Sequence, residues 1–211
     1  MSDLPHPLPD RLEIRPLAKP PVATIRVPGS KSITNRALIM GALSDPVQGC
    51  ELVSALRSED TEIMVAALRE LGFSVRTVWE ESQIHVKRGN YAETIPAWKA
   101  DLFVGNSGTS MRFLTALSSL GHGVYRLDGV SRMRERPMND MLSALRQLGV
   151  EAFSERGDGL PPIVVHGHGL QGHGHGLQGG QAVVSGNVSS QFLSGLLMAA
   201  PLARDDITIH P

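Results

Sequence analysis

A nine-residue pattern occurs twice in this chain and constrains its fold more than any other feature of the sequence. The pattern Met-x-x-Ala-Leu-Arg-x-Leu-Gly begins at Met64 and again at Met141, an offset of 77 residues. Apolar residues at these spacings form one face of a helix, and a closing glycine is typical of a helix end. Repetition at this period predicts stacked supersecondary units that share one core.

The segments around each copy also correspond, and we expect each unit to run strand, helix, strand, helix, strand, strand. Isoleucine- and valine-rich stretches at 84–86 and 163–165 follow the two copies and are typical of strands. In the first unit the predicted elements are a strand over 23–27, a helix over 32–43, an apolar pair at 52–53, a helix over 61–71 capped by Asp60, and strands over 73–78 and 83–86.

Three loops of small polar residues each open a helix, at spacings of about one repeat. They cover residues 29–36, 105–112 and 186–191, and an apolar run follows each one. Unpaired N–H groups at a helix start favour anions, and Lys31 and Arg36 add positive charge there. The Walker spacing GxxxxGK[ST] is absent. Ordinary helix caps with solvated charges therefore remain the alternative to an anion site.

The third unit is cut short. It has its loop, a helix to about Leu202 and a strand over 207–209, but no second helix or final hairpin. Because this would leave apolar faces uncovered, we expect a fragment of a longer protein, with one incomplete domain over 22–211. Residues 1–21 contain six prolines and are predicted to form an extended arm with one short strand at 12–15.

One segment departs from the repeat. The sequence His-Gly-His-Gly-Leu-Gln-Gly occurs twice without change over residues 166–179, and we interpret it as an insertion at a hairpin end. A metal site is the alternative, because histidine is a common ligand. A metal site needs fixed ligands, whereas alternating glycine favours a mobile segment, so no metal or cofactor is predicted.

Composition excludes several classes of protein. With 41% hydrophobic and 19% charged residues, the 211-residue chain is typical of a globular protein, and its net charge of −1 argues against a general nucleic-acid binder. No apolar run is long enough for a membrane helix, and the first residues lack the basic-then-apolar pattern of a signal peptide, so a cytoplasmic location is expected. Cys50, the only cysteine, is interpreted as a small core residue, with a nucleophile as the alternative.

A second basic cluster lies at residues 131–137, where three arginines occur within five residues and Pro137 is expected near the first turn of a helix. A solvated basic turn is the alternative. Lys31, Arg36, Arg112 and Arg132 all fall at loop–helix junctions. If the three units pack around one axis, these junctions share an end. They would then form a cationic site for a small substrate with several anionic groups.

Four motifs in this order resemble those of the 3-phosphoshikimate 1-carboxyvinyltransferase (EPSP synthase) family. They lie at residues 28–38, 105–112, 132–137 and 188–192, and the resemblance covers the chain from Ala23 to its end except for the insertion. It implies an α/β fold of repeated βαβαββ units, the inside-out α/β barrel of enolpyruvyl transferases. Two such domains close on the substrates. This chain is similar to the first, with the N-terminal arm packing against the absent second.

The resemblance also implies a reaction of the shikimate pathway of aromatic amino acid biosynthesis. The enolpyruvyl group of phosphoenolpyruvate is transferred to the 5-hydroxyl of shikimate 3-phosphate, and phosphate leaves. No cofactor, metal, nucleic acid or membrane is implied, and the complete enzyme is expected to be monomeric. By motif, Lys31 would be catalytic and contact both substrates. The other implied substrate contacts are Ser32, Arg36, Gly108, Arg132, Ser189, Ser190 and Gln191, with Asp60, Asn106 and Thr109 as secondary site residues.

Three residues depart from the family pattern. Ser107 and Ser110 stand where many members have alanine, and Phe113 stands where many have proline. The family's catalytic aspartate lies in the second domain, so the chain alone is expected to be inactive. Two alternatives stay open. One is the sister transferase acting on UDP-N-acetylglucosamine, which usually has asparagine in place of Ser32. The other is a non-catalytic anion-binding half-domain.

Overall fold

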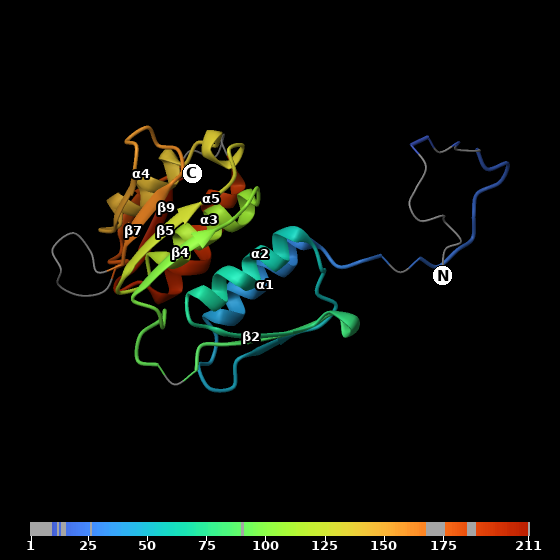
Figure 1. Cartoon of the computed structure of the whole chain (residues 1–211), viewed down its shortest axis with the longest axis horizontal. Coiled ribbons are helices and arrows are strands. Elements are labelled where there is room, and N and C mark those ends of the chain that lie inside the picture. The colour runs from blue at the N-terminus through green and yellow to red at the C-terminus, as the bar shows by residue number, and fades with distance from the viewer. Residues whose placement is uncertain are drawn as a thin grey trace.

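The structure, a computed structural model, describes residues 10–11, 13, 16–25, 27–89, 91–167, 176–184 and 189–210. Figure 1 shows helices packed against twisted sheets, with the described residues directly before the first helix leading away from this body. Within the described residues, no helix is long and apolar enough to cross a lipid bilayer.

The first half of the chain forms a three-stranded antiparallel sheet with two helices. Its strands have the order β1-β3-β2, and α1 and α2 pack against each other on the sheet (Figure 1). The elements are α1 (Lys31–Ala42), β1 (Cys50–Leu52), α2 (Glu59–Glu70), β2 (Ser74–Val78), the 3-10 turn η1 (Trp79–Glu81) and β3 (Gln83–Lys87).

The second half contains a four-stranded sheet of order β4-β5-β7-β6, in which only the β4–β5 pair is parallel. A separate parallel pair is formed by β8 and β9, and β8 contacts α4. The elements are β4 (Lys99–Phe103), α3 (Gly108–Ser118), β5 (Val124–Asp128), η2 (Met133–Glu135), α4 (Asn139–Gln147), β6 (Glu151–Ser154), β7 (Ile163–His166), β8 (Gly180–Val183), α5 (Ser190–Ala199), η3 (Ala200–Leu202) and β9 (Ile207–His210).

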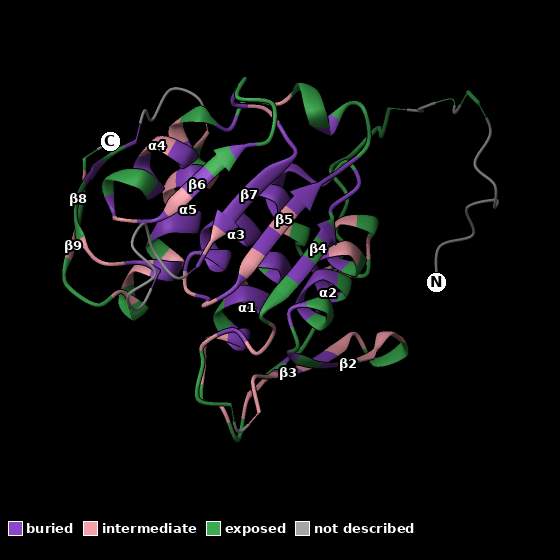
Figure 2. Cartoon of the chain, turned by 60° about the vertical axis from the view of Figure 1, so that its left-hand side comes forward, coloured by how far each residue is buried: buried purple, intermediate pink, exposed green. Residues whose placement is uncertain are grey.

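Helix α3 lies at the centre of the molecule. All of its residues except Arg112 are buried, and it contacts α1, α2, α4 and α5 (Figure 2). Its buried leucines join a continuous apolar core that extends from Leu38 of α1 to Leu196 of α5. The first residues of α3 lie near the first residues of α1, α2 and α5.

Four of the helices begin with a serine N-cap. Ser30, Ser58, Ser107 and Ser189 are the N-caps of α1, α2, α3 and α5, and each side chain accepts a backbone N–H of the first turn. The prediction that Asp60 caps α2 is therefore wrong. Ser58 forms a capping box with Thr61, which moves Asp60 into the first turn, where its side chain can reach other elements.

The helix ends are confirmed at both copies of the repeated pattern. Gly72 and Gly149 follow α2 and α4 with φ values of 89° and 85°, a conformation that glycine adopts without strain. The half-buried Cys50 lies in β1 and packs against the core, as the sequence predicts.

One further prediction, the strand over 23–27, is wrong. The described residues of 23–27 form no strand, because no neighbouring strand pairs with them, and Ile25 and Val27 are 80% and 77% exposed. Pro137 lies near the start of α4, as expected, directly before the N-cap Met138, and the chain leaves η2 in an extended conformation at Arg136. The predicted strand at 12–15, apart from residue 13, and the histidine repeat over 168–175 lie outside the described residues.

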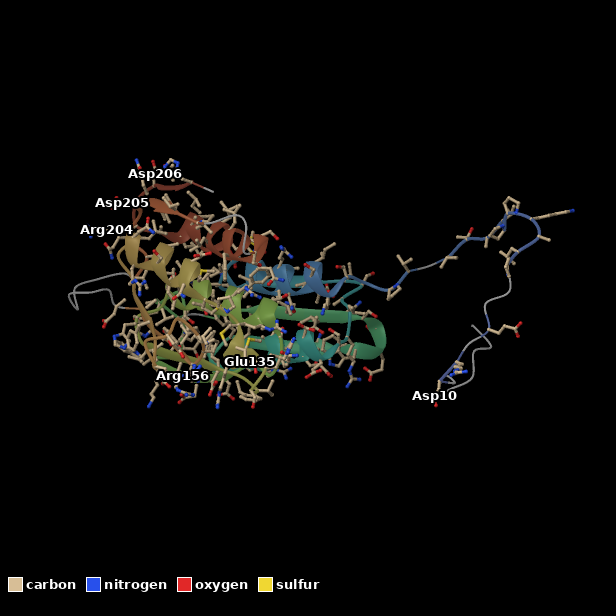
Figure 3. The ribbon with its side chains drawn as sticks, turned by 90° about the horizontal axis from the view of Figure 1, so that it is seen from above. Asp10, Glu135, Arg156, Arg204, Asp205 and Asp206 are labelled. Carbon is tan, nitrogen blue, oxygen red and sulfur yellow. The ribbon has the colours of Figure 1, made fainter. Side chains whose placement is uncertain are left out.

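The two ends of the described chain lie on opposite sides of the molecule. Figure 3 shows Asp10 far from the body, and Arg204, Asp205 and Asp206 on the opposite side. The starts of α1, α2, α3 and α5 lie between these ends. They surround the pocket described next.

Candidate active site

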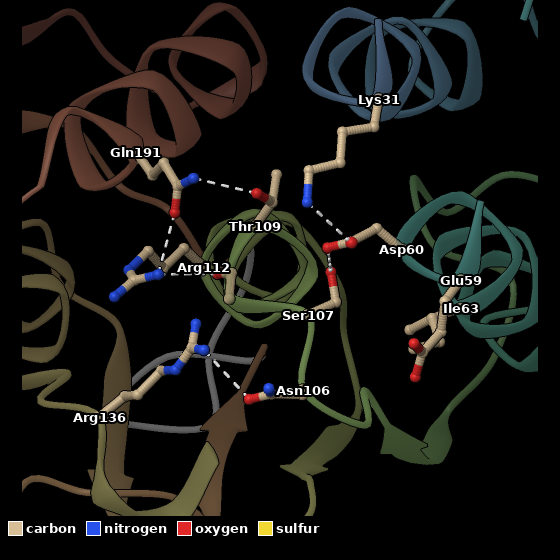
Figure 4. Close-up of a pocket in the computed structure, with 11 residues that line it drawn as sticks. Lys31, Glu59, Asp60, Ile63, Asn106, Ser107, Thr109, Arg112, Arg136 and Gln191 are labelled. Carbon is tan, nitrogen blue, oxygen red and sulfur yellow. Dashed lines mark hydrogen bonds and ion pairs between the residues drawn. The ribbon is translucent and has the colours of Figure 1, made fainter. Parts of the chain in front are cut away.

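A pocket of about 400 Å³ lies where the starts of α1, α2, α3 and α5 come together (Figure 4). Its wall is largely polar and includes side chains from all four helices and from the segment before α4. The lining residues are Lys31, Glu59, Asp60, Ile63, Asn106, Ser107, Gly108, Thr109, Arg112, Arg136 and Gln191. Three cations and two carboxylates therefore share this wall.

A hydrogen-bonded chain joins α1, α2 and α3 on one side of the pocket. Lys31 Nζ lies 3.1 Å from Asp60 Oδ2, and Ser107 Oγ donates to Asp60 Oδ1 at 2.6 Å (Figure 4). Burial raises the pKa of Asp60, but the hydrogen bond from Ser107 and the positive charge of Lys31 outweigh it, so the pKa is lowered overall. Asp60 is therefore ionised at neutral pH and orients Lys31.

The opposite side of the pocket is formed by Arg112 and Gln191. Arg112 Nη1 donates to Gln191 Oε1 at 2.9 Å and to the backbone oxygen of Gly108 at 3.1 Å. Gln191 Nε2 in turn donates to Thr109 Oγ1 at 3.0 Å. The guanidinium also lies over the ring of Phe192, with its Cζ 5.1 Å from the ring centroid. These contacts fix the position of Arg112 with neutral groups only.

Arg136 forms the third side of the pocket. Its Nη2 donates to Asn106 Oδ1 at 3.1 Å (Figure 4). Gly108 lies between Arg136 and Arg112, and a methyl group at position 108 would lie 2.7 Å from Arg112 Nη1 and closer still to Arg136 Nη1. The absence of a side chain at Gly108 therefore lets two guanidinium groups approach the start of α3.

These two guanidinium groups have no anionic partner among the described residues. Burial, and then the neighbouring charge of Arg136, lower the pKa of Arg112. Its pKa is ordinarily so high that the group remains charged. Two adjacent cations with neutral partners at a helix N-terminus are suited to binding an anion such as a phosphate or carboxylate.

Arg36 is one turn along α1 from Lys31 and does not line this pocket. Its guanidinium donates to the backbone oxygen and hydroxyl of Ser32, and Nη2 donates to Ser194 Oγ on α5 at 3.2 Å. Its Cζ lies 5.1 Å from the centroid of the buried Phe113 ring. Arg36 is therefore a further cation without a carboxylate partner in the described structure, held between α1, α3 and α5.

Six of the predicted site residues line the pocket, namely Lys31, Asp60, Asn106, Gly108, Thr109 and Gln191. Ser32 and Arg36 lie beside it on α1, and Ser189 and Ser190 lie at the start of α5. Arg132 does not line it: its side chain is 77% exposed and its Nη1 lies 3.9 Å from Glu135. The roles of all these residues stay predictions.

The substrate contacts and secondary residues implied by the resemblance omit Glu59, Ser107, Arg112 and Arg136, all of which line the pocket, although Arg112 belongs to the cationic site expected at the loop–helix junctions. Arg112 has a signal in the sequence, since it ends the second small-polar loop, and Arg136 is the third arginine of the 131–137 cluster. Ser107 is recognisable as an N-cap, but its contact with Asp60 depends on tertiary structure. No three His, Cys, Asp or Glu side chains gather as a metal site among the described residues.

The fold and the site together define an α/β protein with a cationic pocket at its helix N-termini. A sequence model of the EPSP synthase (3-phosphoshikimate 1-carboxyvinyltransferase) family matches residues 18–211, and the chain belongs to this family.

Known relatives agree with this assignment. The chain is 47% identical over 200 residues to a 3-phosphoshikimate 1-carboxyvinyltransferase of Opitutus terrae, covering 94% of this chain and 44% of the relative. A relative from Trichormus variabilis is 44% identical, with 95% and 45% covered. The solved EPSP synthase of Acinetobacter baumannii superposes with a TM-score of 0.74 at 26% identity, covering 89% of this chain and 40% of that one. The chain thus spans less than half the length of these relatives.

Proposed function

We propose that this chain provides one wall of an active site that transfers the enolpyruvyl group of phosphoenolpyruvate to the 5-hydroxyl of shikimate 3-phosphate. The observation that carries this proposal is the pair of guanidinium groups, Arg112 and Arg136, that converge on Gly108 without an anionic partner in the described structure. Membership of the EPSP synthase family supports the particular reaction.

The charges of the pocket suit this chemistry. Both substrates are anions, and fixed cations offset the repulsion between them as they approach. In the proposed reaction a proton adds to the methylene carbon of phosphoenolpyruvate, and the 5-hydroxyl oxygen bonds to the adjacent carbon as it loses its own proton. Phosphate then leaves, and the methyl group of this intermediate gives up a proton to form the enol ether of the product.

Lys31 is the proposed catalytic residue. Its ammonium group is held by Asp60 at the edge of the pocket, where it can contact both substrates and take part in proton transfer. Ser32, Arg36, Ser189 and Ser190 lie beside the pocket at the starts of α1 and α5. We assign them to shikimate 3-phosphate, because they offer hydroxyl donors and one guanidinium.

We assign phosphoenolpyruvate to the side of the pocket formed by Gly108, Arg112 and Arg136, with Gln191 next to both substrates. Arg136 is a better candidate for this role than Arg132, because Arg136 lines the pocket and Arg132 is largely exposed. Asn106 and Thr109 then act as positioning residues, through their hydrogen bonds to Arg136 and Gln191.

In the complete protein we propose two domains of repeated βαβαββ units, in the inside-out α/β barrel arrangement, that close on the substrates. The order strand, helix, strand, helix, strand, strand from β4 to β7 supports such a unit. The exposed apolar residues before α1, including Ile25 and Val27, support packing of the N-terminal segment against a second domain. We further propose a monomeric cytoplasmic enzyme that requires no cofactor.

The test is an assay of the chain completed by its second domain. Phosphate release should require both phosphoenolpyruvate and shikimate 3-phosphate, and UDP-N-acetylglucosamine should not replace the latter. The 211-residue chain alone should release no phosphate. Release with UDP-N-acetylglucosamine instead would identify the sister transferase, and substrate binding without turnover would identify a non-catalytic anion-binding domain.

A matched pair of variants tests the assignment of the arginines. Because Arg136 faces the proposed phosphoenolpyruvate position, Arg136→Ala should raise the KM for phosphoenolpyruvate on the order of a hundredfold, the size of one or two lost charge-assisted contacts. Arg132→Ala removes the same charge from an exposed position and should change it by less than about threefold. Equal effects of the two substitutions would contradict the assignment.

A further inference from the structure

Ser107 links the start of α3 to the carboxylate of Asp60. Its side chain is buried, and its Oγ lies 2.6 Å from Asp60 Oδ1 and 2.8 Å from Ser110 Oγ. The backbone N–H of Ser110 also points to Ser107 Oγ, at 3.3 Å. Ser107 therefore has three polar neighbours and is itself largely buried in the wall of the pocket.

The direction of each hydrogen bond follows from what each group can donate. An ionised carboxylate only accepts, so the single hydroxyl proton of Ser107 must go to Asp60. The two remaining acceptor positions of Ser107 Oγ are then used by the N–H and the hydroxyl of Ser110. This arrangement leaves Ser107 no alternative partner, so it fixes the orientation of the Asp60 carboxylate.

Lys31 depends on that orientation. Its side chain is 59% exposed, and the hydrogen bond to Asp60 Oδ2 is the one that holds its ammonium group within the described structure. A lysine side chain has four rotatable bonds and samples many positions unless a partner restrains it. The position of Lys31 at the pocket is thus set through Asp60 by a residue that Lys31 does not touch.

We propose that Ser107 is a positioning residue for Lys31, acting by holding the Asp60 carboxylate in the orientation that keeps the ammonium group at the pocket. The proposal rests on the proposed function of the pocket as an anion site. An alanine at position 107 would lack the hydroxyl that holds Asp60.

The charge environment of Asp60 gives a readout that needs no ligand. The charged groups that face it are Lys31 from α1 and Arg136 from the segment before α4, and Glu59 precedes it on its own helix. Because burial raises the pKa of Asp60 while Ser107 lowers it, removing the hydroxyl should raise that pKa. A purely structural role of Ser107 as the N-cap of α3 would leave the Asp60 titration unchanged.

The first experiment is a carbon-13 NMR titration of the Asp60 side-chain carboxyl group in the full 211-residue chain. Ser107→Ala should move the midpoint to higher pH. Ser110→Ala is the matched control, since it removes the neighbouring buried hydroxyl without removing the donor to the carboxylate, and it should leave the midpoint in place. An unchanged midpoint in Ser107→Ala, or equal shifts in both variants, would overturn the proposal.

The second experiment measures binding of inorganic phosphate by the same chain in a double-mutant cycle of Ser107→Ala and Lys31→Ala. Ser107→Ala should weaken binding about fivefold when Lys31 is present, the size of one hydrogen bond, and have no effect when Lys31 is absent. Equal weakening of phosphate binding with and without Lys31 would mean that Ser107 acts only as a helix cap, and it would overturn the proposal. Failure of the unmodified chain to bind phosphate would instead contradict the proposed function, and the Asp60 titration would still decide the role of Ser107.

Discussion

Replacing Gly108 by alanine tests the pocket most directly, because this glycine separates two guanidinium groups. The added methyl group would lie 2.7 Å from Arg112 Nη1, whereas ordinary contacts begin near 3.4 Å, so Arg112 must move by about 0.7 Å. Arg136 lies closer to the added carbon and must move further. Both clashes involve the ends of flexible side chains, so the backbone of α3 is expected to stay in place.

The expected loss is in ligand binding rather than in folding. Displacing the two groups weakens one or two charge-assisted contacts to a bound anion, each worth about 1.5–3 kcal/mol, and therefore lowers affinity roughly tenfold to a hundredfold. Gly108 is the first residue of α3 and its φ is not positive, so alanine suits its backbone conformation. Alanine is favoured over glycine in helices by up to about 1 kcal/mol, and the folding stability should be unchanged or slightly higher.

Calorimetric titration with inorganic phosphate and thermal unfolding of the same samples measure the two quantities. Gly157→Ala is the control, because the same substitution at this position should affect stability and not phosphate binding. Position 157 has open space around it but a φ of 72°, so alanine should lower stability and leave phosphate affinity unchanged. If Gly108→Ala binds phosphate as tightly as the unmodified chain, the two guanidinium groups do not form the anion site.

The remaining predictions concern Lys31 and Asp128. In the protein completed by its second domain, Lys31→Ala should lower turnover at least about a hundredfold, as expected for one lost electrostatic group, and near-normal turnover would remove Lys31 from the site. The hydrogen bond from Arg134 holds the pKa of Asp128 below its ordinary value. Ionised Asp128 therefore stabilises the fold at pH values above the pKa that it has in the unfolded chain. This contribution is lost as the pH falls through the pKa that Asp128 has in the folded chain. Urea unfolding should therefore show Asp128→Asn to be destabilised at pH 7 and nearly equivalent to the unmodified chain near pH 2, and an equal deficit at both pH values would contradict this.

Sequence patterns identified the helices well, because their signals are local. The apolar spacing and the closing glycines at Gly72 and Gly149 need no tertiary information, and the small-polar loops indicate where α1, α3 and α5 begin. The prediction of a strand at 23–27 was wrong because strand formation depends on contacts that are not local. A strand needs a partner, and the local preference of β-branched residues cannot supply one.

The choice between Arg132 and Arg136 could not be made from the sequence. The cluster contains three arginines at alternate positions, and the 3-10 turn η2 decides which of them faces the pocket. Arg134 donates two hydrogen bonds to Asp128, at 2.8 Å and 2.6 Å, which holds the segment against β5. With Arg134 directed to the sheet and Arg132 to solvent, Arg136 is the one that reaches Asn106.

The partners of the site arginines explain how the pocket keeps its charge available. Arg112 is held by an amide oxygen, a backbone oxygen and the ring of Phe192, and Arg36 by hydroxyls, a backbone oxygen and the ring of Phe113. A carboxylate in any of these places would hold the arginine more strongly but would cancel the field that an anionic substrate needs. The described arginines that pair with carboxylates, among them Arg134 and Arg126, do not line the pocket. The division between neutral and charged partners thus separates the arginines available to a ligand from those that stabilise the fold.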